Sequence, residues 1–174
     1  AWQADVYLEL LATLAIAATH QSQVGQDFEI YASQEFGLVE LADAHSRASA
    51  LMPQKKNPYA LAAIRTQAAQ AAGDVASALT ALHTGSARTD HFHLLNGTVP
   101  RALDEAVAIA RLTASVLDGI ELRTERFAQI ARESFVTAAD VADVLALTGD
   151  IDYRSAHMIV GRAVRDLVDA GEPS

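Results

Sequence analysis

Residues 61–82 read LAAIRTQAAQAAGDVASALTAL, an alanine-rich run whose larger apolar side chains are Ile64, Val75, Leu79 and Leu82. Alanine has the highest helix propensity of the amino acids, and its small side chain lets helix backbones approach closely. Proline suits the first turn of a helix, where its missing N–H is not needed, and Pro58 stands just before this run. The stretch therefore predicts a long helix in a tightly packed bundle, which several subunits can share.

Apolar residues at helical spacing continue on both sides of this run. Residues 2–31 are apolar on nearly every side of a helix, which predicts a helix that is buried on nearly every side. A further helix is expected from residue 100 to about 117, with Val107 and Val116 among its core positions and a stop at Gly119. Long helices therefore account for most of the chain up to this glycine.

Shorter helices are expected in the last third of the chain. Capping and terminating residues mark them: Thr124, Thr137 and Asp152 as N-terminal caps, and Gly149 and Gly171 as ends. No stretch alternates between apolar and polar residues in the manner of a half-buried strand, so the predicted fold class is all-α. We expect residues 1–120 to be part of a long-helix bundle and residues 121–174 to form a small C-terminal helical domain.

The composition argues against several classes of partner. The 174 residues carry a formal net charge of −9 without the clustered Lys and Arg that bind phosphate backbones, so no nucleic acid is expected. The apolar run from Val6 to Ala18 is shorter than the roughly 18 to 20 residues of a membrane span, so no membrane is expected either. The chain has no cysteine, which fits a reducing cytosol and predicts a cytoplasmic location.

The motif that carries chemistry is ASALMPQKKNP, residues 48–58. It places a hydroxyl, two ammonium groups and a carboxamide within a short loop. The polar stretch before it, residues 43–49, is also predicted to be a loop, and so are residues 83–96, after the alanine-rich helix. Such a set suits a small anion, because Lys supplies charge and Asn supplies directional hydrogen-bond donors. A solvated basic loop that caps the next helix explains the same residues, and spacing alone favours this second interpretation.

The motif is similar to the signature Gly-Ser-Ser-x-Met-Pro-x-Lys-x-Asn-Pro of the fumarase, aspartase and argininosuccinate lyase superfamily. Residues 51–58 have the form found in argininosuccinate lyases, and the similarity extends along nearly the whole chain. Flanking segments agree as well: Ala18-Thr19-His20, Gln34-Glu35-Phe36, Leu41-Ala42-Asp43-Ala44 and Ile64-Arg65. The resemblance implies the long-helix bundle of that superfamily and a carbon–nitrogen lyase that releases fumarate from a small dicarboxylate substrate.

The resemblance also implies roles for single residues of the serine loop, residues 45–58. Ser49 matches the catalytic base, which removes a proton from the carbon next to a carboxylate. Lys55 and Asn57 match residues that hold the carboxylates and stabilise the aci-carboxylate intermediate, whereas Lys56 is expected to point to solvent. The nearby His45 is interpreted as a surface-loop histidine. No cofactor and no metal are predicted, because His91 and His93 alone are a weak zinc pattern.

The resemblance further implies a homotetramer in which three subunits build each active site. Ala1 and Trp2 lead directly into helical sequence with no initiator Met and no cap, so we expect the chain to start inside a longer protein. The superfamily's other catalytic motifs lie upstream of the matched region. The chain alone is therefore expected to be a fragment that is inactive by itself.

Two departures from the family pattern bear on the substrate. Ala48 and Ala50 replace a Gly and a Ser of the signature, so the loop loses a flexible position and one hydroxyl. In the segment 83–97, Thr89, Leu94 and Gly97 stand where argininosuccinate lyases carry Tyr, Gln and Lys side chains that grip the arginine end of the substrate. We therefore expect another N-substituted aspartate as the substrate.

Other functions remain open on the sequence. Genuine argininosuccinate lyase activity in arginine biosynthesis is the first alternative, and a catalytically inactive, crystallin-like relative is the second. A helical oligomerisation module without chemistry is a third. The retention of Ser49, Lys55 and Asn57 together favours an active lyase, because an inactive relative has no need of all three side chains.

Overall fold

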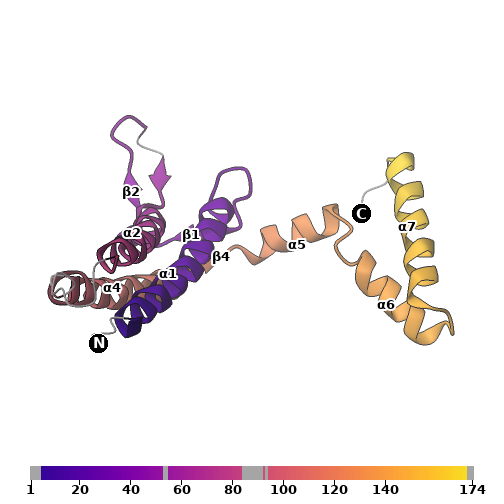
Figure 1. Ribbon diagram of the computed structural model, residues 1–174. Coiled ribbons are helices and arrows are strands. Elements are labelled where there is room, and N and C mark those ends of the chain that lie inside the picture. The colour runs from indigo at the N-terminus through magenta and orange to yellow at the C-terminus, as the bar shows by residue number, and fades with distance from the viewer. Residues whose placement is uncertain (1–4, 53–54, 84–91, 93, 172–174) are drawn as a thin grey trace. The chain divides into compact units, whose positions relative to one another are not determined.

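The computed structural model describes residues 5–52, 55–83, 92 and 94–171, most of which are helical (Figure 1). The predicted all-α class is confirmed. The chain divides into two units, residues 1–122 and residues 123–174. No helix of the described ranges is long and apolar enough to cross a membrane.

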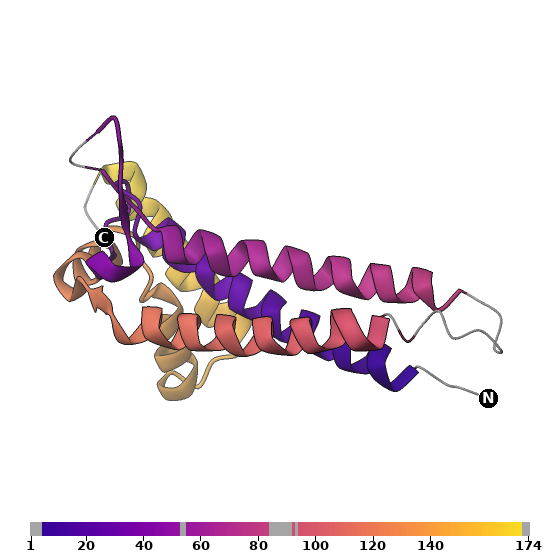
Figure 2. The ribbon, with the colours of Figure 1, turned by 90° about the vertical axis from the view of Figure 1, so that its left-hand side faces the viewer.

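The first unit is built on α1 (Asp5–Tyr31), α2 (Tyr59–Ala81) and α4 (Val99–Asp118), which lie side by side (Figure 2). The predicted long helices are therefore confirmed, and Pro58 is the residue that caps the start of α2. The largest fully buried side chains are Leu11, Leu61, Ile64 and Val116, contributed by all three helices. The apolar seam between these helices is the core of the unit.

Two of the burial predictions are wrong for the single chain. α1 buries Leu11, Ala15 and Ala18, but Val6 and Ile16 are 68% and 58% exposed, because among the described elements it is chiefly α2 and α4 that pack on this helix. In α4, Val116 is buried as expected while Val107 is 50% exposed. The buried positions of α4 recur at spacings of three and seven residues, the stripe that faces the other two helices: Val99, Ala102, Ile109 and Val116.

A short antiparallel ladder closes one end of the first unit. Strand β1 (Val39–Leu41) pairs with β4 (Ile120–Leu122), in a register that sets Glu40 opposite Glu121. Val39 and Leu41 are buried, so β1 contributes to the core at this end of the unit. No strand was predicted here, because strands of three residues are too short to show an alternating pattern.

At the other end of the first unit, a π-helical turn, η2 (Leu94–Thr98), precedes α4. Leu94 and Val99 pack there with Leu11, Ala78 and Ala102 in one buried cluster. Part of the segment 83–97 therefore completes the hydrophobic core beside the C-terminal end of α2.

The second unit contains α5 (Thr124–Glu133), α6 (Ala138–Thr148) and α7 (Tyr153–Ala170). Asp152 caps α7 as predicted, since its Oδ1 accepts the backbone N–H of Ser155 at 3.0 Å. Gly149 and Gly171 end their helices as predicted. The prediction for Thr124 is wrong, because α5 already includes this residue and Arg123 holds the cap position.

Candidate functional site

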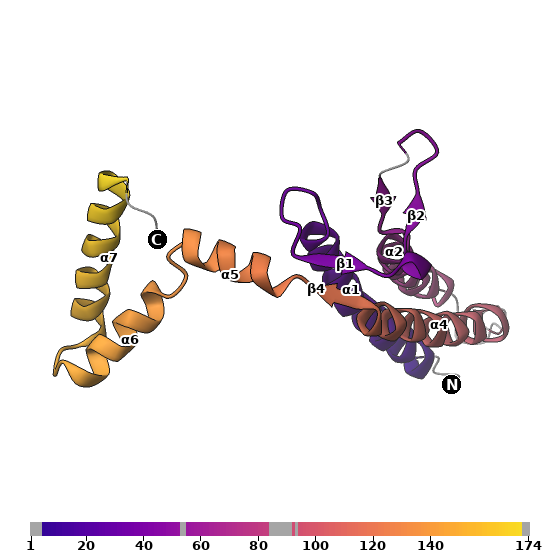
Figure 3. The ribbon, with the colours of Figure 1, turned by 180° about the vertical axis from the view of Figure 1, so that it is seen from behind.

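The residues of the serine motif form an antiparallel hairpin that projects from the ladder end of the first unit (Figure 3). Strand β2 (Arg47–Ala48) pairs with β3 (Lys56–Asn57), directly before α2 begins. We call the described residues 47–52 and 55–57 the serine hairpin. Inside it, the Ser49 N–H donates to the Lys55 carbonyl at 3.1 Å, which closes the turn. Residues 43–49, read as loop from the sequence, instead contain a 3-10 turn, η1 (Asp43–His45), followed by β2.

The hydroxyl oxygen of Ser49 lies among backbone donors. Its Oγ accepts the N–H of Leu51 at 3.2 Å and the N–H of Met52 at 3.1 Å. Both N–H dipoles point at the oxygen, so they favour negative charge on it, and neither bond uses the hydroxyl proton. Ser49 is half-buried in this position. The following residues, Pro53 and Gln54, lie outside the described ranges.

The other two predicted site residues flank the second strand. Lys55 is exposed, and no carboxylate of the described ranges lies within ion-pair distance of its ammonium group. The Asn57 carboxamide donates to the Arg47 carbonyl over 3.5 Å, the long limit of a hydrogen bond. Neither polar group is therefore tightly held by the rest of the hairpin, so both are available to a ligand that approaches this loop.

Lys56 is exposed as predicted, but its ammonium group also binds two carboxylates, which the sequence did not indicate. Its Nζ lies 2.5 Å from Asp43 Oδ1 and 3.4 Å from Glu40 Oε1, since the pairing of β3 with β2 brings Lys56 back beside Ala48, five residues after Asp43. The hydrogen bond with Asp43 raises the pKa of the Lys56 ammonium group, and the same bond lowers the pKa of the Asp43 carboxyl. The pair remains open to water, since the Lys56 side chain is 53% exposed.

His45 is also placed differently from the prediction of a surface-loop histidine. Its Nε2 lies 3.0 Å from Ser115 Oγ of α4, and its Nδ1 is buried without a hydrogen-bond partner. The ring packs against Gly119, where a Cβ would approach it to 3.2 Å. His45 thus attaches η1 to the C-terminal end of α4. No local sequence pattern signals a contact over 70 positions.

The described part of the segment 83–97 lies far from Ser49 within the chain. Thr89, and the His91 and His93 of the weak zinc pattern, lie outside the described ranges. Leu94 is 7% exposed and packs against Ala78, near the C-terminal end of α2. The serine hairpin precedes the N-terminal end of the same helix, whose 23 residues span about 35 Å. One chain therefore does not bring Ser49 and Leu94 into one site.

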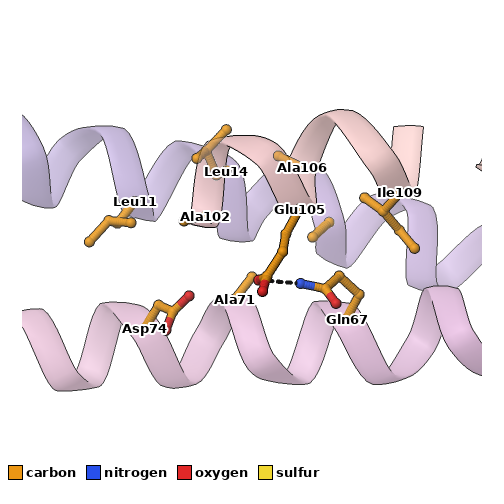
Figure 4. Close-up of a pocket in the computed structure, with 10 residues that line it drawn as sticks. Leu11, Leu14, Gln67, Ala71, Asp74, Ala102, Glu105, Ala106 and Ile109 are labelled. Carbon is orange, nitrogen blue, oxygen red and sulfur yellow. Dashed lines mark hydrogen bonds between the residues drawn. The ribbon is translucent and has the colours of Figure 1, made fainter. Parts of the chain in front are cut away.

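A polar cluster that sequence reasoning missed lies between the long helices (Figure 4). Gln67 Nε2 donates to Glu105 Oε2 at 2.7 Å, and Arg101 binds both Glu105, at 2.8 Å, and Asp74, at 2.5 Å. The described residues contain no group of three or more side chains suited to a metal. The side chains of this cluster bind one another, so its arrangement fits helix packing better than catalysis.

Two family models match the chain. Residues 2–73 match the model described as lyase, and residues 135–174 match the model described as the C-terminal region of argininosuccinate lyase. The chain is 37% identical over 171 residues to the argininosuccinate lyase of Thermus thermophilus, and the alignment covers 96% of this chain and 36% of that protein. The argininosuccinate lyase of Solibacter usitatus is 34% identical over 170 residues, with 97% and 36% covered. The chain thus spans about a third of the length of these relatives.

Solved structures share the fold. EDDS lyase in complex with formate superposes with a TM-score of 0.82 at 28% identity, covering 97% of this chain and 34% of that one. A variant of EDDS lyase with bound fumarate gives the same values. The 3-carboxy-cis,cis-muconate lactonizing enzyme of Pseudomonas putida has a TM-score of 0.74 at 20% identity, with 98% and 38% covered, and shows the fold alone.

The two family models match separate parts of the chain, residues 2–73 and residues 135–174. The similarity to the two argininosuccinate lyases covers 96% and 97% of the chain, serine hairpin included. These matches agree with the motif read from the sequence. The chain belongs to the argininosuccinate lyase family of the fumarase/aspartase superfamily.

Proposed function

We propose that the protein to which this chain belongs is a lyase that eliminates fumarate from an N-substituted aspartate by breaking its C–N bond. The observation that carries the proposal is the Ser49 hydroxyl, whose oxygen accepts two backbone N–H groups inside the family's signature hairpin. Family membership supports the reaction class, and the related EDDS lyase variant has fumarate bound.

In the proposed reaction, Ser49 acts as the base. Its deprotonated oxygen takes a proton from the substrate carbon that is β to the nitrogen and is bonded to a carboxylate. The electron pair of that C–H bond is first held in the aci-carboxylate and then forms the double bond of fumarate, while the C–N electron pair leaves with the substrate nitrogen, which is protonated and departs as an amine. A serine hydroxyl is a poor base in water, but the N–H groups of Leu51 and Met52 stabilise the alkoxide when water is excluded.

Lys55 and Asn57 are proposed to bind the carboxylates of the substrate. Removal of the proton places extra negative charge on the adjacent carboxylate, which becomes an aci-carboxylate dianion. An ammonium group and a carboxamide aimed at this charge stabilise it more than they stabilise the ground state, so they lower the barrier. The exposure of Lys55 and the long 3.5 Å bond of Asn57 support this role, since both groups are available.

We further propose a homotetramer whose subunits share active sites. Two observations support sharing: Ser49 and Leu94 lie near opposite ends of α2, and α1 exposes Val6 and Ile16. Only neighbouring copies bring such distant segments together, and packing of long helices buries such apolar side chains. Since the chain spans about a third of its relatives, we expect residues 1–174 alone to release no fumarate at enzymatic rates.

The leaving amine is proposed to differ from arginine. Leu94 stands where the family has a polar side chain that grips the arginine end, and it is buried in the core, so it offers no hydrogen bond to a substrate. Argininosuccinate itself is the second candidate substrate, because the relatives at 37% and 34% identity are argininosuccinate lyases.

The experiment is a fumarate-release assay of the complete parent protein. Argininosuccinate, adenylosuccinate and ethylenediamine-disuccinate are offered in parallel, and fumarate is followed by its ultraviolet absorbance. Release from a compound other than argininosuccinate supports the proposal in full. Release from argininosuccinate supports the proposed lyase activity but contradicts the proposal that the leaving amine differs from arginine. No release from any compound rejects the proposed activity in favour of an inactive, crystallin-like relative.

A further inference from the structure

We propose that Lys56 is a positioning residue of the serine hairpin, because its ion pairs with Asp43 and Glu40 connect β3 to η1 and β1 and thereby set where Ser49 is presented. The inference rests on the proposed function, in which Ser49 is the base. It assigns a role to the lysine that the signature leaves variable and that we expected to face solvent.

One side of the contact is held in place by the fold. Glu40 lies in β1 and pairs across the ladder with Glu121 of β4. Its neighbours in the strand, Val39 and Leu41, are 3% and 5% exposed, so the backbone that carries the carboxylate is anchored in the core. Asp43 follows at the start of η1, which contacts α2. The backbone that carries both carboxylates is therefore anchored, although the Asp43 side chain itself is 85% exposed.

The other side of the contact belongs to the projecting hairpin. Lys56 lies in β3, with Ala48 directly across the ribbon in β2, and Ser49 follows Ala48. The hairpin has little buried surface of its own, and Leu51 at its tip is 90% exposed. Segments with few buried contacts open at low free-energy cost, so a contact at the base of the hairpin has a large share in its orientation.

The pairing of Lys56 also fixes which face of the ribbon is presented. Successive side chains of a strand point to opposite faces. Because the Lys56 side chain turns toward Asp43 and Glu40, the Asn57 side chain next to it is directed to the opposite face of the ribbon. That face remains for the substrate, which is where the proposed function needs the carboxamide. To bind the substrate directly, Lys56 would have to break its ion pairs with Asp43 and Glu40.

A cation–π contact also lies near the base of the hairpin. The Arg47 guanidinium lies 5.5 Å from the centre of the Tyr59 ring, at the start of α2. This cation–π contact restrains β2, and the ion pairs of Lys56 restrain β3. Loss of the Lys56 contacts should therefore loosen the hairpin without unfolding it.

The test uses the complete parent protein with the substrate it turns over best. Lys56→Met, which keeps the apolar stem, should lower kcat about two- to fivefold and change KM by less than about twofold, because both exposed ion pairs of Lys56 are lost. Lys56→Arg should stay within about twofold of wild type, and the exchange Asp43→Lys with Lys56→Asp should restore most of the loss. The matched control, Arg65→Met, removes the exposed ion pair with Glu29 between α1 and α2 and should leave kcat within about twofold.

A second readout does not depend on turnover. Hydrogen exchange of peptides that cover residues 45–58 should be about two- to fivefold faster in Lys56→Met and normal in Lys56→Arg, while peptides of α1 and α2 exchange as in wild type. Unchanged kcat and unchanged exchange in Lys56→Met would overturn the inference. A loss that neither Lys56→Arg nor the charge exchange repairs would also overturn it. If Ser49→Ala abolishes turnover while Lys56→Met has no effect, only this inference fails; if Ser49→Ala stays active, the proposed function fails as well.

Discussion

The hydroxyl oxygen of Ser49 lies 3.1 Å from the backbone nitrogen of Met52, whose N–H donates to it, and the N–H of Leu51 approaches it from 3.2 Å. These two donors belong to the backbone, so the side chains of residues 51 and 52 are not needed for them. If these donors stabilise the alkoxide of the proposed base, the turnover rate depends on the backbone N–H of residue 52 and not on the thioether of the Met52 side chain.

Met52→Leu should therefore keep kcat within about twofold, whereas Met52→Pro, which has no N–H, should lower kcat about 10²-fold, the loss typical for one such donor. Steady-state kinetics of the parent protein checks both variants, and circular dichroism checks that the helices remain. A Met52→Pro variant with kcat within about threefold of wild type would show that this hydrogen bond does not support catalysis.

The helices were predictable from the sequence because their signal is local. The alanine-rich run of α2 and the apolar spacing of α1 extend over 23 and 27 residues, long enough for the helical period to be read. Burial on each side was less predictable, since it depends on neighbours: Ile16 has an apolar context in the sequence and remains 58% exposed in the chain.

The contacts that shape the site were not predictable, because they join residues that are distant in the sequence. Leu41 pairs with Ile120, and His45 meets Ser115, across long connections without a local pattern. The motif identified Ser49, but neither its N–H donors nor the turn of Lys56 toward Asp43 follows from spacing. Such contacts depend on the path of the hairpin and not on the residue types alone.

The ion pair of Lys56 and Asp43 should persist over a wide pH range. The Lys56 hydrogen bond lowers the pKa of Asp43 below its ordinary value of 3.8, so the contribution of this carboxylate is present above about pH 4 and is lost as pH falls through the lowered pKa. The pKa of Lys56 is raised above 10.5, chiefly by Asp43, so its contribution is present below that pH and is lost as pH rises through the raised pKa.

Between about pH 6 and 9 neither group titrates, so the pair should add no pH dependence to the rate. Plots of log kcat against pH for wild type and Lys56→Met should therefore run parallel in this range. Curves that converge or cross within it would mean that Lys56 interacts with a group that titrates near neutrality.

Two glycines of the second unit should respond oppositely to alanine. A Cβ at Gly149 would lie 2.6 Å from the Leu145 carbonyl oxygen, so the end of α6 must shift, and Gly149→Ala should lower the free energy of unfolding by about 1–3 kcal/mol. A Cβ at Gly161, inside α7, meets nothing within 4 Å, so Gly161→Ala should raise it by about 0.5–1 kcal/mol. Denaturant titration measures both, and equal effects of the two variants would contradict the steric account.

The exposed apolar side of α1 leads to a prediction about assembly. Ile16 is 58% exposed in the middle of the helix, and the proposed tetramer buries such side chains between copies. Ile16→Glu places a charge in that interface and should shift the complete protein from tetramer to smaller species in light scattering. Gln26→Glu, at an exposed polar position of the same helix, should leave the mass unchanged. An Ile16→Glu protein that keeps the mass of the wild-type assembly would exclude this side of α1 from the interface.

The most direct test of the central claim is fumarate release by the complete protein with Ser49→Ala, beside wild type. If Ser49 is the base, kcat should fall at least about 10³-fold, because nothing else in the serine hairpin takes over the proton transfer. The thermal midpoint should change little, since the hairpin projects away from the helical core. Loss of turnover with an intact fold is the predicted result, and a kcat within about tenfold of wild type would contradict the account.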